Sequence, residues 1–374
     1  MMEIIFLSFY FLYFYILNPQ AKNMSTVTFK SGAQLSKKSI TIWRIVQFTI
    51  WLLGAGILTC LLFFPPMGVL LFWNLLIPIA PFLFVVAVGI WRNVCPLATT
   101  NLLPRHLGLS QRKKLTAKQI GIFNVIATFA LFIIVPLRHS IFNNNGVATG
   151  IMIIVMAVIG ITLGFFYEWK SAWCSGLCPV HPVEKLYGGN VFMSMPNANC
   201  DNCMNCVIPC PDSTPNINPL SAHKTEYNVL SGIMIIGGLP GFIWGWFHVP
   251  DAIAIENIES FLSVYYIPMV GLAITAIVYF NIDRVIKVEY KQKLINVFAA
   301  AGVSCYYWYR LPAWVGLGSF QEDGVLINLS KSLPLWIVPV MRIVSTSFFF
   351  YWLVLRKPNK QSWVIRPAFA KKIA

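Results

Sequence analysis

The feature that most constrains this chain is a series of apolar segments, each long enough to cross a lipid bilayer. A hydrocarbon core of about 30 Å needs roughly 20 helical residues. Only 11% of the 374 residues are charged, whereas a soluble domain is about a quarter charged. We therefore expect an all-α membrane protein with eight transmembrane helices. The eight segments lie at 45–64, 67–91, 119–137, 147–167, 228–247, 262–282, 294–317 and 333–355.

The distribution of positive charge predicts the orientation of these helices. If the N-terminal arm is cytoplasmic, the pieces on the same side carry 24 of the 28 Lys and Arg residues. Cytoplasmic loops of membrane proteins collect Lys and Arg, so we expect a multi-pass protein of the inner (cytoplasmic) membrane. The net charge of +15 has the same origin. The sequence contains no basic stripe interleaved with aromatic residues, so it does not predict nucleic-acid binding. The cytoplasmic pieces are 18–44, 92–118, 168–227, 283–293 and 356–374.

Four regions follow from this pattern. The N-terminal arm, 1–44, contains a short apolar run at 4–17 that is either an extra helix or an extension upstream of a start at Met24. A four-helix membrane part follows, then a cytoplasmic segment rich in cysteine, then a second four-helix membrane part. These last three regions are 45–167, 168–227 and 228–374.

The cytoplasmic segment contains the strongest motif, Cys200-x2-Cys203-x2-Cys206-x3-Cys210-Pro211. This is the spacing of bacterial ferredoxins. Thiolates two residues apart can wrap a tight loop around one face of a cubane, and the backbone N–H groups between them offset its negative charge. Zinc is the alternative, but zinc sites usually join two C-x2-C pairs across a longer gap. We expect a 4Fe-4S cluster, and a ferredoxin-like loop, at these four cysteines.

Two further cysteine elements precede this run. Cys95-Pro96 follows the first pair of predicted helices, and Cys174-x3-Cys178-Pro179 follows the second pair, so the chain has an internal repeat. In two-cluster ferredoxins the fourth cysteine of such a run binds the other cluster. These elements therefore predict a possible second cluster that involves Cys95, Cys174 and Cys178.

The number of cysteines leaves two arrangements open. The cytoplasmic side holds seven of the nine cysteines, and two cubanes with only cysteine ligands need eight. Either the chain binds one cluster and the other cysteines are structural, or it binds two clusters and one corner lacks a thiolate. In the second case the corner is filled by water, Asp212 or His181, or the cluster has three irons. Cys60 and Cys305 are expected to be buried apolar residues.

On these motifs the chain resembles the membrane-bound 4Fe-4S polyferredoxin family of the NapH/NosR type. The resemblance covers roughly 45–220, and Trp91 departs from it, because a first C-x3-C-P element would have its leading cysteine there. The family implies electron transfer, typically between a quinol pool and a partner protein such as a ferredoxin, a flavodoxin or an oxidoreductase subunit. The residues that match its motifs are Cys174, Cys178, Pro179, Cys200, Cys203, Cys206 and Cys210.

Two arginines inside the predicted spans are candidates for a second site. Arg310 and Arg342 lie several residues from the outer ends of their segments, and a charge at that depth costs a few kcal/mol unless it is paired or solvated. They predict either a snorkelling arginine in an aromatic belt or a polar site for a quinone carbonyl or an anion. His139 and His248 lie near the outer surface, so the sequence does not favour a haem.

The sequence thus predicts a membrane electron-transfer protein that uses one or two 4Fe-4S clusters, with a quinone as a further candidate cofactor. More than one function remains open. The chain could instead be a reductase or electron-donor component of a membrane oxidoreductase. It could also be a redox-sensing or assembly accessory protein, or a transporter with the two arginines in its substrate path.

Overall fold

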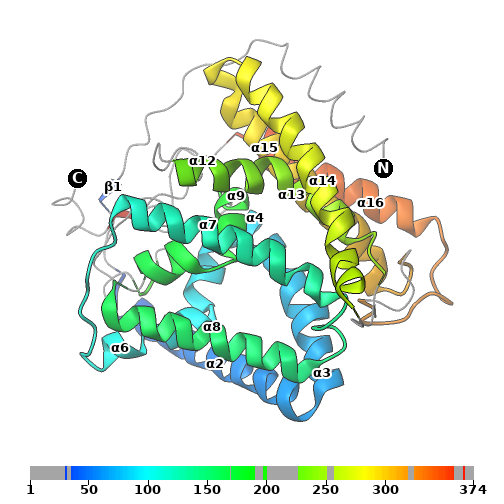
Figure 1. Cartoon of the computed structure of the whole chain (residues 1–374). Coiled ribbons are helices and arrows are strands. Elements are labelled where there is room, and N and C mark those ends of the chain that lie inside the picture. Colours follow the sequence, from blue (N-terminus) through cyan, green and yellow to red (C-terminus); the bar gives the residue numbers. More distant parts are fainter. Residues whose placement is uncertain are drawn as a thin grey trace. The chain divides into compact units, whose positions relative to one another are not determined.

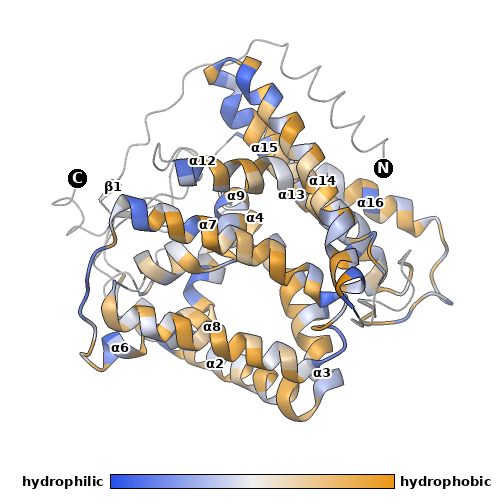
Figure 2. Ribbon diagram, viewed as in Figure 1, coloured by the Kyte–Doolittle hydropathy of each residue, from blue (hydrophilic) through white to orange (hydrophobic). Residues whose placement is uncertain are grey.

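A computed structural model describes residues 30–31, 35–168, 170–189, 197–199, 226–250, 257–318, 324–357 and 365–366. The apolar run at 4–17 and the cysteine run from Cys200 to Cys210 lie outside these residues. Within them, seven helices are long and apolar enough to cross a membrane (Figure 1), and hydrophobic residues, orange in the ribbon of Figure 2, make up much of these helices. The seven are Lys37–Phe63, Pro65–Asn101, Lys118–Arg138, Gly146–Phe166, Glu226–Trp246, Ile258–Val285 and Ile337–Leu355.

The described residues form two units, and the first holds the cysteine elements. This N-terminal unit contains the described residues up to Gly232, together with those in 250–265 and 358–374. Strand β1 (Lys30–Ser31) pairs in parallel with β2 (Ile365–Arg366). The helical elements are α2 (Lys37–Phe63), α3 (Pro65–Val69), η1 (Leu70–Leu76), α4 (Ile77–Val94), α5 (Pro96–Asn101), α6 (Leu103–His106), α7 (Ala117–Ile134), η2 (Pro136–Arg138), α8 (Gly146–Phe166), η3 (Lys170–Leu177), α9 (His181–Tyr187) and α12 (Glu226–Gly232).

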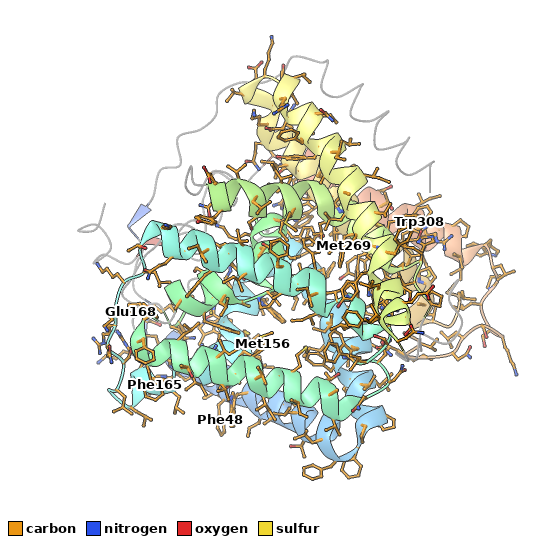
Figure 3. The ribbon with its side chains drawn as sticks, viewed as in Figure 1. Phe48, Met156, Phe165, Glu168, Met269 and Trp308 are labelled. Atoms are coloured by element: carbon orange, nitrogen blue, oxygen red, sulfur yellow. The ribbon has the colours of Figure 1, made fainter. Side chains whose placement is uncertain are left out.

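Polar caps begin the long helices of this unit, and apolar side chains cover their outer faces. The Ser36 hydroxyl accepts from the Ser39 N–H at 3.2 Å at the start of α2, and a capping box of Thr116 and Gln119 begins α7. Helices α2 and α8 lie side by side. Phe48, 61% exposed, projects outward from α2 (Figure 3). An apolar face without a protein partner is what a lipid-exposed helix presents.

The second unit, here the C-terminal unit, contains residues 233–249 and the described part of 266–357. Close backbone contact holds its first two helices together. A Cβ at Gly241 would collide with the Gly271 carbonyl, and one at Gly245 would lie 2.5 Å from the Ile267 carbonyl oxygen. Such small-residue contacts are typical of membrane helix pairs. The elements are η4 (Ile233–Gly238), α13 (Leu239–Trp246), α14 (Ile258–Val285, from Tyr266 onward), η5 (Val288–Tyr290), α15 (Lys291–Trp314), α16 (Ile337–Phe350) and η6 (Tyr351–Leu355).

One of the eight predicted spans needs correction. The segment 294–317 does form a helix, α15, and its 24 residues would extend about 36 Å. It is nevertheless absent from the seven apolar helices of the described chain, because the run Tyr306-Tyr307-Trp308-Tyr309-Arg310 lowers its mean hydropathy. Helix α15 packs against α13 and α16, so much of its surface meets protein rather than lipid and can include polar side chains. The other seven predicted spans are observed as helices that are long and apolar enough to cross a membrane.

Candidate functional site

Cys95 lies at a break between two helices. Its N–H donates to the Trp91 carbonyl at 2.9 Å and so closes α4. Pro96 then occupies the first position of α5. A residue before proline is pushed out of the α conformation, and proline at the first helical position costs no hydrogen bond. The Cys-Pro dipeptide therefore ends one helix and starts the next, which leaves the cysteine at the corner.

Close packing brings this corner against α8. A Cβ at Gly160 would collide with the Asn101 side chain, and a Cβ at Gly164 would lie 2.8 Å from the Asn101 carbonyl oxygen. On the other side, a Cβ at Gly54 of α2 would lie 3.0 Å from the Pro96 ring. Helix α5 thus lies between α2 and α8, and its contact with α8 is closer than a Cβ at Gly160 or Gly164 would allow.

The second cysteine element follows α8 directly. Cys174 lies in the π-helical segment η3, and the Cys178 N–H donates to the Trp173 carbonyl at 3.0 Å. Pro179 follows, and α9 begins at His181. Both Cys-Pro dipeptides therefore end one helical segment just before another begins, although the π-helical turn was not anticipated from the sequence.

These two elements bring three cysteines together. Cys95 and Cys174 both pack against the small apolar cluster of Ala98 and Leu102. Burial, and then charge on the neighbouring Cys95 sulfur, raises the pKa of the Cys178 thiol to about 12. Within the described ranges, however, no three His, Cys, Asp or Glu side chains are arranged to hold a single metal ion. A cubane would lie between its ligands and hold their sulfurs further apart than one ion does.

A buried ion pair supports the cysteines. Arg92 of α4 pairs with Glu184 of α9, and their side chains are 5% and 8% exposed. It ties the helix that leads into Cys95 to the helix that follows Cys178. A second pair, Arg105 to Glu168 at 3.1 Å, joins α6 to the residue just after α8 (Figure 3). Burial raises the pKa of Glu168 above its ordinary value, and the Arg105 charge opposes that shift.

The residues just before the ferredoxin-type run bind the same frame. The Asn197 amide donates to the Arg92 carbonyl at 3.1 Å, and the Ala198 N–H donates to the Asn93 side chain at 2.8 Å. The Arg44 guanidinium of α2 donates to the Asn199 side chain at 2.7 Å. Asn199 directly precedes Cys200 in the sequence. The entry to the cysteine run is therefore fixed two to three residues from Cys95 along α4.

His181 is a candidate for the non-cysteine corner that the sequence left open. It is 2% exposed, and its Nδ1 atom has no hydrogen-bond partner in the described part of the chain. Burial, and then the charges of Lys185 and Arg92, lowers its pKa well below the ordinary value. The ring is therefore neutral, which is the form that binds metals. Asp212, the other side chain considered, lies outside the described residues.

Two cysteines and two histidines that the sequence did not favour as ligands lie in or next to helices. Cys60 is partly buried in α2, and Cys305 is buried in α15. His248 donates from Nδ1 to the Trp244 carbonyl at 2.7 Å in its own helix turn. His139 is buried beyond the end of α7. The expectation that none of these holds a cofactor stays a prediction.

The two candidate arginines differ in their surroundings. Arg342 donates from Nε to the Trp308 carbonyl at 3.2 Å and lies 5.0 Å from that ring. Arg310 is fully buried, and its nearest ring centroids lie 5.6–6.0 Å from the guanidinium carbon. Two of those rings are Trp246, the last residue of α13, and Phe247, which caps that helix. No pattern in the segment that contains Arg310 indicates these two rings, because contacts between helices leave no local signal.

Comparison with known proteins gives one limited similarity. Over 82 residues the chain is 28% identical to the ferredoxin-type protein NapH of Haemophilus influenzae. That alignment covers 21% of this chain and 27% of the relative. No protein-family model matches the chain, and no solved structure matches it significantly. The chain therefore spans about a quarter of the curated relative that it matches, which is a ferredoxin-type protein.

Proposed function

We propose that this protein transfers electrons in a membrane through two iron–sulfur clusters. The first would be held by Cys200, Cys203, Cys206 and Cys210. The second would be held by Cys95, Cys174 and Cys178, with His181 or a water at the fourth corner. Bound clusters supply one-electron oxidation and reduction without bond chemistry. The similarity to a ferredoxin-type protein supports the class of function.

The observation that carries the proposal is the convergence of three cysteines from two separate Cys-Pro elements. Cys95 and Cys174 share one apolar cluster although 78 residues separate them in the sequence. Purely structural cysteines would not need two proline-terminated corners, a buried ion pair and glycine-mediated helix contacts to bring them together. The segment 197–199, which directly precedes the ferredoxin-type run in the sequence, is hydrogen-bonded to α4 two to three residues before Cys95.

The chain contributes ligands and their orientation. The Arg92–Glu184 pair ties α4 to α9, and the three thiols are partly buried between the helical segments. Because the Cys178 thiol has a raised pKa, it is protonated at neutral pH without metal. Metal binding must then release protons, as it does at thiolate sites in general.

A basic loop beside the second element supports docking of an acidic redox protein. Arg112, Lys113 and Lys114 are exposed. The Lys113 N–H donates to the Phe166 carbonyl at 3.0 Å, and the Glu168 N–H donates to the Lys113 carbonyl at 3.1 Å. The loop thus lies against the chain that leads from α8 into η3 and Cys174. An acidic ferredoxin or flavodoxin is the proposed partner, and a quinol pool the proposed second reactant.

The test is the iron and acid-labile sulfide content per chain, with EPR spectra of the dithionite-reduced protein. Two cubanes give about eight irons and spin-coupled signals. Replacing Cys174 and Cys178 together by Ala should lower the iron to about four and remove the coupling, while Cys60→Ala should leave both unchanged. About four irons in the native protein, unaffected by the double variant, would contradict a second cluster. Zinc without iron would refute electron transfer altogether.

A further inference from the structure

The C-terminal unit contains a buried charge that the proposed electron transfer does not explain. Arg310 lies in α15 and is 0% exposed. Its three side-chain nitrogens, Nε, Nη1 and Nη2, have no hydrogen-bond acceptor among the residues that the structure describes. A guanidinium is always protonated in proteins and has five N–H donors. Burying this charge without a partner is strongly unfavourable, so an acceptor with a counter-charge is expected.

Aromatic rings compensate only part of this cost. The guanidinium carbon lies 5.8 Å from the Trp246 ring centroid, 5.6 Å from that of Phe247 and 6.0 Å from that of Tyr306. Cation–π attraction extends to about 6 Å, so all three contacts are at its outer limit. Ring faces also cannot accept the full set of N–H donors.

The backbone closes the remaining side of the guanidinium. Gly324, with φ of +78°, lies so close that a Cβ there would collide with Nη1. The chain after Gly324 is tied to the end of α15, because the Leu326 and Ile327 N–H groups donate to the Trp314 carbonyl at 3.1 and 3.0 Å. The enclosure is tight, which limits any ligand to a small group.

Arg342 of the same unit provides the comparison. It is only half-buried, and it donates to the Trp308 carbonyl at 3.2 Å while its guanidinium lies over that ring. Its charge is thus accommodated by the usual means for an arginine near a membrane surface. Arg310 has neither exposure nor, within the described residues, an acceptor.

We propose that Arg310 is the centre of a binding site for a small oxyanion, a carboxylate or a phosphate group. An anion supplies both acceptor oxygens and the counter-charge that the enclosed guanidinium lacks. A neutral carbonyl such as that of a quinone would supply only the acceptor. Guanidinium donors match the geometry of carboxylate and phosphate oxygens in a bidentate manner. The site does not depend on the iron–sulfur clusters.

Thermal unfolding of the purified protein in neutral detergent tests this site, with inorganic phosphate or acetate added at constant ionic strength. A ligand at ten times its Kd lowers the unfolded population about 11-fold, so a saturable rise in Tm is expected. Arg310→Met should abolish that rise and should raise the Tm without anion, because it removes a buried charge. Arg310→Lys should weaken the rise, and the control Arg342→Gln should retain it.

A second arm distinguishes a free anion from a lipid headgroup. Nanodiscs of phosphatidylcholine alone are compared with nanodiscs in which phosphatidylglycerol replaces part of that lipid. A Tm rise with phosphatidylglycerol that requires Arg310 assigns the phosphate to lipid, whereas a rise with inorganic phosphate only assigns it to a free anion. Absence of both rises would overturn the proposal.

Two further results would also overturn it. Glu322 and Asp323 precede Gly324 in the sequence and could supply an internal counter-charge. Binding of phosphate only after Glu322→Gln and Asp323→Asn are introduced would show that an internal ion pair fills the site. Loss of quinol-driven cluster reduction in Arg310→Met, with no anion effect on the native Tm, would assign the arginine to a quinone instead.

Discussion

Removing one partner of the buried pair between Arg92 and Glu184 should destabilise the N-terminal unit strongly. Both side chains are less than a tenth exposed, so Glu184→Gln removes the carboxylate that pairs with the buried Arg92 charge. Breaking a buried pair in this way typically costs about 3–5 kcal/mol. For a unit of this size, such a loss lowers the Tm by roughly 10 °C.

The assay is thermal unfolding in detergent, and the iron content of each variant is then measured after a mild heat step. Replacing both residues by apolar ones, Arg92→Met with Glu184→Leu, should recover most of the stability, because no charge is then left unpaired. The matched control is the more exposed pair of Lys291 and Asp283, whose side chains are 38% and 27% exposed. Lys291→Gln should cost no more than about 1 kcal/mol.

Two results would refute this reasoning. A Glu184→Gln protein as stable as the native one would mean that water or another group already compensates the pair. The second is a double variant that loses as much stability as the two single variants, Arg92→Met and Glu184→Leu, lose together. That result would mean that the two residues act independently, because the stability changes of coupled residues are not additive.

Three further outcomes follow from the structure. Gly160→Ala should cost about 1–3 kcal/mol in thermal unfolding because α5 lies against that glycine, whereas Gly56→Ala, with nothing within 4 Å, should be neutral or stabilising by up to about 1 kcal/mol. Lys113→Glu with Lys114→Glu should slow reduction by an acidic ferredoxin about tenfold or more at low salt in stopped-flow experiments, with the difference disappearing at high salt. Because the pKa of Glu168 is raised, the folded protein binds a proton at this carboxyl more readily than the unfolded chain does. The stability of the protein should therefore fall as pH rises above about 4.5, and Glu168→Gln should flatten that part of the pH–Tm curve.

Local properties of the sequence predicted most of the helices well. The segment expected at 147–167 is observed as α8, Gly146–Phe166, and the one expected to end at 64 ends at Phe63. The length of an apolar segment depends only on consecutive residues, so it can be read directly from the sequence. Helix α15 was predicted as an ordinary span for the same reason, and its polar composition reflects burial against other helices, which no local pattern reports.

The candidate sites depended more on contacts between distant segments. Counting spans placed Cys95 and Cys174 on one side of the membrane, but not at one apolar cluster. The pairing of Arg92 with Glu184 joins residues 92 positions apart, and no sequence motif indicates it. Trp246 and Phe247 are near Arg310 because of the way α13 packs on α15. Each of these features depends on helix packing, which the periodicity of one segment does not encode.

The two Cys-Pro corners explain why the N-terminal unit departs from a plain helical bundle. Proline ends a helical segment without leaving an unsatisfied donor, after Cys95 and again after Cys178. The glycines of α8 then let α5 approach closely enough for Cys95 and Cys174 to contact one cluster of side chains. The proline and glycine positions, which weaken ordinary helices, are thus the positions that gather the thiols.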